Sequence, residues 1–89
     1  MYKFQISDKL KEIMCKLSKK DKNLYEQLIK KIKEIITGID IEHYKNLKYD
    51  MKDSKRVHIG PFVLIFQFDK NSNTINFDDF DHHDNIYGH

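Results

Sequence analysis

The sequence lacks several residues that would point to particular classes of protein. It has no tryptophan, one proline and one cysteine among 89 residues. The lone cysteine, Cys15, excludes an internal disulfide and fits a reducing compartment, so we expect a cytoplasmic protein. No run of about 18 apolar residues occurs, and the first residues lack the continuous apolar segment of a secretory signal. We therefore expect no association with a membrane.

Arginine is also scarce, and the charges are unevenly distributed. Residues 1–56 hold 15 Lys and Arg against nine Asp and Glu, whereas residues 57–89 hold one Lys against five Asp. Only one of these cations, Arg56, is an arginine. The basic first part could attract phosphate or an acidic peptide, and the acidic end could attract cations or fold back. A solvated, lysine-rich surface explains the same composition.

The most apolar stretch of the chain covers residues 56–68. Apolar residues alternate with Arg56 and His58 in its first part, which is the period of a strand buried on one face. Gly-Pro at positions 60 and 61 signals a turn. The strand that follows is expected to place one row of residues in the core: Phe62, Leu64, Phe66 and Phe68. This pattern predicts a β-hairpin with Arg56 and His58 facing a partner.

The residues before the hairpin predict a strand and two helices. Alternation over Tyr2–Ile6 indicates a short strand with one buried face. Apolar residues at helical spacing over 10–17 indicate an amphipathic helix, with Ser7 or Asp8 as its cap. The segment Ser18–Asp21 matches a capping box, so we expect the second helix to begin there.

The second helix is expected to end at Gly38, and a further strand over Thr74–Phe80 follows the hairpin. The predicted order is β-α-α-β-β-β within a single domain, residues 1–89. Because consecutive strands joined by short turns pair in opposite directions, we expect a small, mainly antiparallel sheet. Both helices would cover one of its faces, which makes the fold class α+β.

Several segments match the motifs of one known protein family. Leu47-Lys48 lies where that family has a Leu-Lys/Arg pair. Residues 56–60, Arg-Val-His-Ile-Gly, resemble its Arg-x-Arg-x-Gly motif, and residues 62–66, Phe-Val-Leu-Ile-Phe, resemble its Tyr-Arg-x-x-Tyr/Phe strand. His82 and Tyr87 resemble the His and Tyr of the terminal Gly-His-Arg-x-x-x-Tyr element. With these motifs and the order of its elements, the chain resembles the RelE/ParE superfamily of toxins from toxin–antitoxin systems, and the resemblance covers essentially the whole chain.

The resemblance implies a type II toxin whose RelE-like branch cuts messenger RNA on the ribosome. The ribose 2′-hydroxyl attacks the phosphate, and no metal or other cofactor is required. The catalytic residues implied are Arg56, His58, His82 and Tyr87. Arginine suits bidentate contact with phosphate, histidine can donate or accept a proton, and tyrosine can stack on a base. His82 could instead orient the chain terminus through a hydrogen bond.

The implied partners are the ribosome, messenger RNA and a cognate antitoxin. The basic first half suits an acidic antitoxin segment that is partly disordered or helical. Four lysines are expected to follow the RNA backbone: Lys45, Lys48, Lys52 and Lys55.

Two departures from the family pattern leave alternatives open. Val63 stands where the family has an arginine, and the terminus carries four aspartates, which repel RNA: Asp78, Asp79, Asp81 and Asp84. A ParE-like or degenerate toxin that acts by binding a protein, without nuclease activity, is therefore an alternative. A metal-dependent hydrolase built on the Asp and His residues of the terminus is another, although their spacing matches no known metal site.

Overall fold

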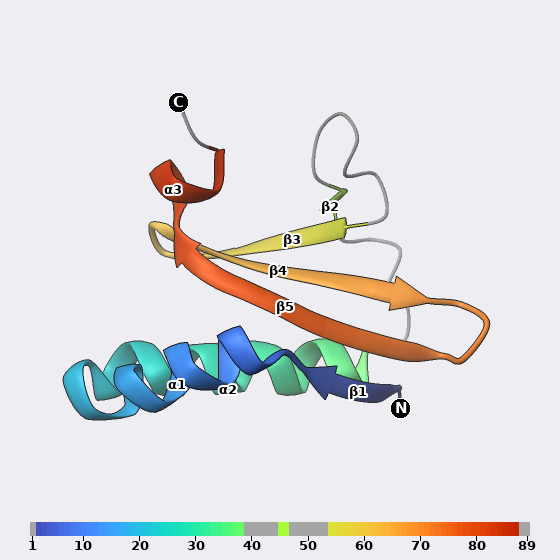
Figure 1. Cartoon of the computed structure of the whole chain (residues 1–89), viewed down its shortest axis with the longest axis horizontal. Helices are drawn as coiled ribbons and strands as arrows, with labels where there is room; N and C mark the ends of the chain where they lie inside the picture. Colours follow the sequence, from blue (N-terminus) through green and yellow to red (C-terminus); the bar gives the residue numbers. More distant parts are fainter. Residues whose placement is uncertain (1, 39–44, 47–53, 88–89) are drawn as a thin grey trace.

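The computed structural model describes residues 2–38, 45–46 and 54–87 (Figure 1). The elements in chain order are β1 Lys3–Ile6, α1 Asp8–Lys20, α2 Lys22–Thr37, β2 Lys45–Asn46, β3 Ser54–Ile59, β4 Phe62–Asp69, β5 Thr74–His82 and α3 His83–Tyr87. The predicted order β-α-α-β-β-β is confirmed. The two elements that were not predicted are short, β2 and α3.

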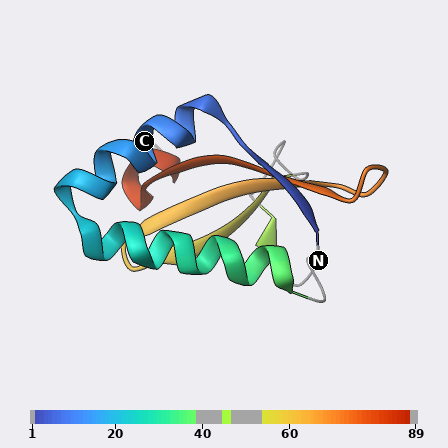
Figure 2. The same cartoon turned by 90° about the horizontal axis from the view of Figure 1, so that it is seen from below.

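The strands form one mixed sheet in the order β1-β5-β4-β3-β2. Neighbouring strands are antiparallel except for β1 and β5, which are parallel. Helices α1 and α2 lie side by side beneath the sheet, and α3 lies on its other side (Figures 1 and 2). The fold is therefore α+β with a mainly antiparallel sheet, as expected. We call the side that carries α1 and α2 the helix face and the other side the open face.

Each long helix begins at a side-chain cap. The Leu10 backbone N–H donates to Ser7 Oγ at 3.0 Å at the start of α1, as predicted. The Leu24 N–H donates to Asp21 Oδ1 at 3.1 Å at the start of α2. The expected capping box was wrong, because Ser18 lies inside α1 and its hydroxyl donates to the Cys15 carbonyl. Asp21 has a non-helical backbone and its carboxylate satisfies an otherwise unpaired N–H, so it ends one helix and starts the next.

The hairpin of β3 and β4 forms as predicted, with Ile59 paired to Phe62. Gly60 has a φ of 59° in the connecting turn, a left-handed conformation that glycine adopts without strain. The row predicted to lie in the core, Phe62, Leu64, Phe66 and Phe68, is on the helix face of β4, and we call it the aromatic row. Its members are buried or packed against the main core, whose buried residues are Leu10, Leu28, Ile32, Ile35, Ile36, Ile59, Leu64, Phe66, Ile75, Phe77 and Phe80.

A β-bulge interrupts the pairing of β4 with β5. Ile65 is paired with Asp79 and Phe66 with Phe77, so Asp78 has no partner on β4. One extra residue on one strand is the definition of a bulge. Phe77 and Phe80 are three positions apart, so regular alternation would place them on opposite faces, and the bulge lets both reach the helix-face core.

Candidate functional site

Helix α3 folds back over the open face of the hairpin. The backbone N–H of His83, its first residue, donates to the Pro61 carbonyl of the β3–β4 turn at 2.8 Å. Ile86 and Tyr87 pack against Val63 and Ile65, which form a second, smaller core on this face. Helix α3 is therefore held against β4, the strand that neighbours Arg56 and His58.

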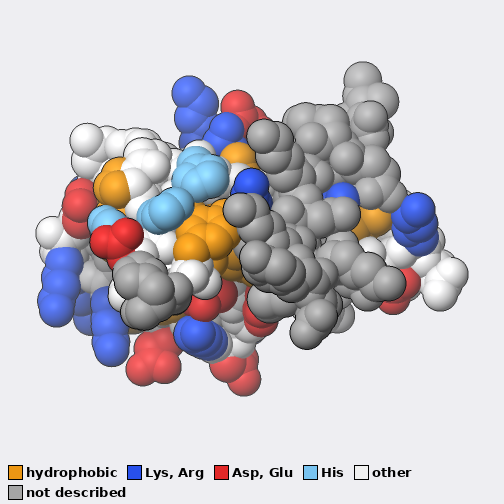
Figure 3. All heavy atoms as spheres, turned by 90° about the horizontal axis from the view of Figure 1, so that it is seen from above, with side chains coloured by type: hydrophobic (Ala, Val, Ile, Leu, Met, Phe, Trp, Pro, Cys, Tyr) orange, Lys and Arg blue, Asp and Glu red, His pale blue; other side chains and the backbone are white. Residues whose placement is uncertain are grey.

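This arrangement gathers Arg56, His58 and Tyr87 on the open face. The Arg56 guanidinium carbon lies 5.4 Å from the centre of the Tyr87 ring, within the range of a cation–π contact. The His58 and Tyr87 rings are stacked, 6.5 Å apart and inclined by only 18°. Residues about 30 positions apart in the sequence thus share one surface, on which histidine side chains gather beside hydrophobic ones (Figure 3).

The Tyr87 hydroxyl has an unusual environment. Its oxygen is buried, and it makes no hydrogen bond in the part of the chain that the structure describes. A buried hydroxyl without a partner destabilises a folded protein by about 1–3 kcal/mol. Such a group is a candidate for a functional role, because packing alone would favour phenylalanine at this position.

His83, and not the predicted His82, lies beside His58 and Tyr87 on the open face. The His83 ring lies 5.8 Å from the His58 ring and 4.6 Å from the Tyr87 ring. His82 is paired with Phe62, so its side chain is on the helix face, where it meets the Phe62 ring edge-on at 5.5 Å. Its Nδ1 accepts a hydrogen bond from the Asp84 N–H at 3.2 Å. This hydrogen bond joins His82 to the first turn of α3, and the role of His82 in orienting the terminus stays a prediction.

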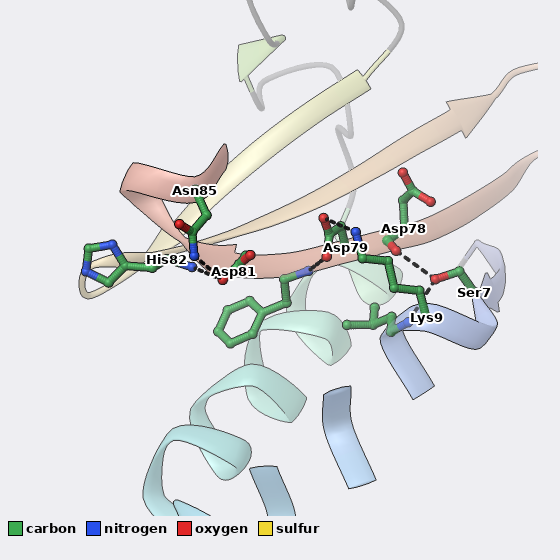
Figure 4. A network of polar contacts seen from close by, with 9 residues as sticks. Ser7, Lys9, Asp78, Asp79, Asp81, His82 and Asn85 are labelled. Atoms are coloured by element: carbon green, nitrogen blue, oxygen red, sulfur yellow. Dashed lines mark hydrogen bonds and ion pairs between the residues drawn. The ribbon is translucent and has the colours of Figure 1, made fainter. Parts of the chain in front are cut away.

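Two acidic residues near the site, Asp79 and Asp81, accept hydrogen bonds through their side chains (Figure 4). The Asp79 carboxylate accepts a hydrogen bond from Lys9 Nζ at 3.0 Å. This hydrogen bond, followed by the attraction of the carboxylate, raises the pKa of Lys9. Asp81 accepts from the His82 N–H at 2.7 Å and from Asn85 Nδ2 at 3.1 Å, which ties β5 to α3. The Asp79 and Asp81 carboxylates therefore stabilise the fold, and these donors partly compensate their negative charge.

The lysines predicted to follow RNA are distributed differently. Lys55 is only 6% exposed. Because neighbouring residues of a strand face opposite sides of the sheet, its side chain is on the helix face, away from Arg56, and does not reach the site. Lys45 is in β2, with its backbone paired to that of Arg56. Lys48 and Lys52 lie outside the described residues.

Two other lysines border the site instead. A hollow of about 310 Å³ beside His58 is lined by Lys30 and Lys31 of α2. Lys31 also forms an ion pair with Glu34 at 2.9 Å. Because α2 approaches the β3–β4 turn, these two lysines line the same hollow as His58.

The family is decided by comparison with known proteins. A model of the ParE toxin of type II toxin–antitoxin systems (parDE) matches residues 5–87. The chain belongs to this toxin family. It is 49% identical over 88 residues to a chain of Methanocaldococcus jannaschii that is provisionally named toxin RelE4, covering 98% of this chain and 92% of that one. The resemblance to the RelE/ParE superfamily is thereby confirmed.

Solved structures place the toxin in the same fold. A metal-bound toxin from Helicobacter pylori is 25% identical, with a TM-score of 0.75 over 97% of this chain and 99% of that one. The toxin of the intact E. coli RelBE toxin–antitoxin complex is 21% identical, with a TM-score of 0.68 over 92% of this chain and 96% of that one. The second likeness is one of fold alone.

Two further observations concern the described residues of this toxin. No three of their His, Cys, Asp or Glu side chains are grouped so that they would hold a metal ion. None of the helices in residues 2–38 and 54–87 combines the length and the apolar character needed to cross a membrane.

Proposed function

We propose that this toxin cleaves messenger RNA on the ribosome through attack of a ribose 2′-hydroxyl on the neighbouring phosphate. The observation that supports this most is the meeting of Arg56, His58 and Tyr87 on the open face, with the Tyr87 hydroxyl buried and unpaired. A cation beside two groups able to exchange protons is what such a cleavage needs. The toxin would then act in the cytoplasm, where ribosomes translate.

The proposed step forms a bond between the 2′-oxygen and phosphorus and breaks the bond to the 5′-oxygen. The products are a 2′,3′-cyclic phosphate and a 5′-hydroxyl. Arg56 stabilises the negative charge that develops on the phosphate oxygens. His58 accepts the proton of the 2′-hydroxyl. Tyr87 donates a proton to the leaving oxygen once RNA binding turns its buried hydroxyl toward the substrate. His83, which contacts both rings, is positioned to return the proton between turnovers.

The test uses purified toxin, ribosomes and a defined message, with cleavage sites mapped by primer extension. We expect cuts with the wild-type toxin and none with Arg56→Ala. Lys70→Ala is a control, because Lys70 is an exposed lysine of the β4–β5 turn, far along β4 from the site. A message that stays intact with wild-type toxin and ribosomes contradicts the proposal.

We further propose that a cognate antitoxin, acidic and partly disordered or helical, holds the toxin inactive. Structures of this fold include a toxin–antitoxin complex, which supports such a partner. The described part of α1 and α2 carries exposed lysines that an acidic segment would contact: Lys9, Lys11, Lys16, Lys19, Lys20, Lys22, Lys30 and Lys33. If the toxin expressed from its own operon has the mass of the isolated chain, this proposal fails.

A second function is favoured by Val63. This residue stands where the resemblance leads us to expect an arginine, and it is fully buried beneath α3. That position therefore supplies no cation for a phosphate. The alternative is a ParE-like or degenerate toxin that binds a protein target and does not cleave RNA. Arrested growth without RNA cleavage on expression in a host supports a protein target, whereas normal growth together with antitoxin binding supports a degenerate toxin.

A further inference from the structure

A row of uncharged polar residues crosses the open face next to the candidate site. Gln5 of β1 is paired with Asn76 of β5, Asn76 with Gln67 of β4, and Gln67 with Ser54 of β3. Directly paired residues on neighbouring strands direct their side chains to the same face. With strands about 4.8 Å apart, the four side chains form a line of about 14 Å. We call these four residues the amide row.

Most of the hydrogen-bonding capacity of the amide row is unused. Gln67 Nε2 donates to Ser54 Oγ at 3.3 Å. The side-chain amides of Gln5 and Asn76 make no hydrogen bond within residues 2–38, 45–46 and 54–87. Gln5 and Gln67 are exposed and Asn76 is half-buried. Strands are enriched in β-branched and aromatic residues and depleted in asparagine, so packing alone does not explain three amide side chains paired in register.

The amides surround a hollow whose chemistry selects its ligand. The hollow measures about 190 Å³ and is lined by Gln5, Gln67 and Asn76, and by the bulge residue Asp78. A phosphate would be repelled by the Asp78 carboxylate, and no lysine or arginine of the described residues lines the hollow. Each amide presents a donor and an acceptor side by side, which matches the edge of a nucleic-acid base. A carboxylate adds an acceptor for an exocyclic amino group.

We propose that the amide row holds the edge of a base of single-stranded RNA beside Asp78 and favours adenine and cytosine, whose exocyclic amino group donates to that carboxylate, over uracil, whose carbonyl oxygens it repels. The proposal rests on the proposed function, because RNA must reach the open face. Ser54 is two residues from Arg56 along β3, a rise of about 7 Å. A strand whose phosphate contacts Arg56 therefore reaches the row with an adjoining nucleotide.

The test measures binding of labelled adenine, cytosine and uracil oligonucleotides whose 2′-oxygens are methylated to prevent cleavage. Fluorescence anisotropy gives the ratio of the uracil Kd to the adenine Kd. We expect a ratio of about ten or more for wild-type toxin, since one good bidentate contact discriminates by about that factor. Asn76→Leu and Gln67→Leu should reduce the ratio to near one, while Asn76→Gln, which keeps an amide, should retain part of it. Asn23→Leu, on exposed α2 surface, is the control and should leave it unchanged.

The outcomes separate this proposal from the proposed function. Wild-type toxin that cleaves ribosome-bound message but binds the three oligonucleotides equally overturns the amide row alone. A preference that persists in both leucine variants overturns it as well. Lost cleavage in Arg56→Ala together with a shifted cleavage pattern in Asn76→Leu supports both proposals. If the wild-type toxin neither cleaves message nor binds RNA, both fail.

Discussion

Replacing Tyr87 with phenylalanine tests whether a buried hydroxyl is kept for function at the expense of stability. The substitution removes one oxygen and leaves the ring in contact with Arg56, His58 and the small core of Val63 and Ile65. Because that oxygen is buried without a hydrogen-bond partner among the described residues, its removal should relieve a penalty of about 1–3 kcal/mol. We therefore expect Tyr87→Phe to be at least as stable as the wild type.

The size of the effect can be measured by urea and thermal unfolding followed by circular dichroism. For a domain of this length, each kcal/mol shifts Tm by about 4–8 °C. The matched variant is Tyr87→Ala, which removes the whole half-buried ring and should lower the free energy of unfolding by about 2 kcal/mol. The two variants should thus change stability in opposite directions.

Cleavage of ribosome-bound message completes the test. Loss of a positioned proton donor slows a reaction by about 10²–10⁴-fold, so both variants should be nearly inactive. A Tyr87→Phe toxin that is destabilised by 1 kcal/mol or more, a threshold of about the size of one net hydrogen bond, would show that the hydroxyl has a partner. Full activity of Tyr87→Phe would show that the hydroxyl is not used.

Three further predictions concern other parts of the structure. Arg56→Lys keeps the charge but loses the planar fork, so cleavage should fall by about 10²–10³-fold while the free energy of unfolding changes by less than about 0.5 kcal/mol; an unchanged rate contradicts the role of the guanidinium. Asp21→Ala should destabilise the toxin by about 1 kcal/mol and Ser18→Ala by less than half as much. A larger loss of stability in Ser18→Ala than in Asp21→Ala would support the capping box that was predicted at Ser18. The hydrogen bond from Lys31, then its charge, lowers the pKa of Glu34, so their pair stabilises the fold above the ordinary pKa of the carboxyl group and stops doing so as pH falls through the lowered value. Glu34→Gln should accordingly lower Tm at pH 7, with a gap that closes in acid; a gap that persists in acid contradicts the pairing.

Much of the fold could be predicted because local pattern and tertiary packing agree. The alternation over β3 and β4 corresponds to the two faces of the sheet, and the apolar stripe of α2 meets the aromatic row. The predicted start of α2 was wrong because two nearby residues, Ser18 and Asp21, could each cap a helix. Ser18 matched a motif, but only Asp21 lies where the chain leaves helical geometry. A motif match does not show which of two competing caps the chain uses.

The candidate site was predictable in part. Arg56 and His58 followed from strand alternation, and Tyr87 from the family resemblance. The adjacent histidines 82 and 83 look alike in sequence, but the position of Phe80 distinguishes them. Phe80 is buried in the core, and a residue two positions later on the same strand faces the same side, which places His82 on the helix face. The extra residue Asp78 gave no comparable signal. Bulges depend on pairing between strands, so the hollow beside the amide row became visible only in the structure.

The parallel pairing of β1 with β5 has a consequence for the synthesis of this toxin. These strands join residues 3–6 to residues 74–77, and the site itself needs Tyr87 near the end of the described chain. Contacts between such distant residues form late, and a growing chain folds only with the segments already released from the ribosome. A nascent toxin therefore carries Arg56 and His58 without their third member. A protein proposed to attack ribosome-bound message would remain harmless to the ribosome that is making it until the segment that carries Tyr87 has left that ribosome.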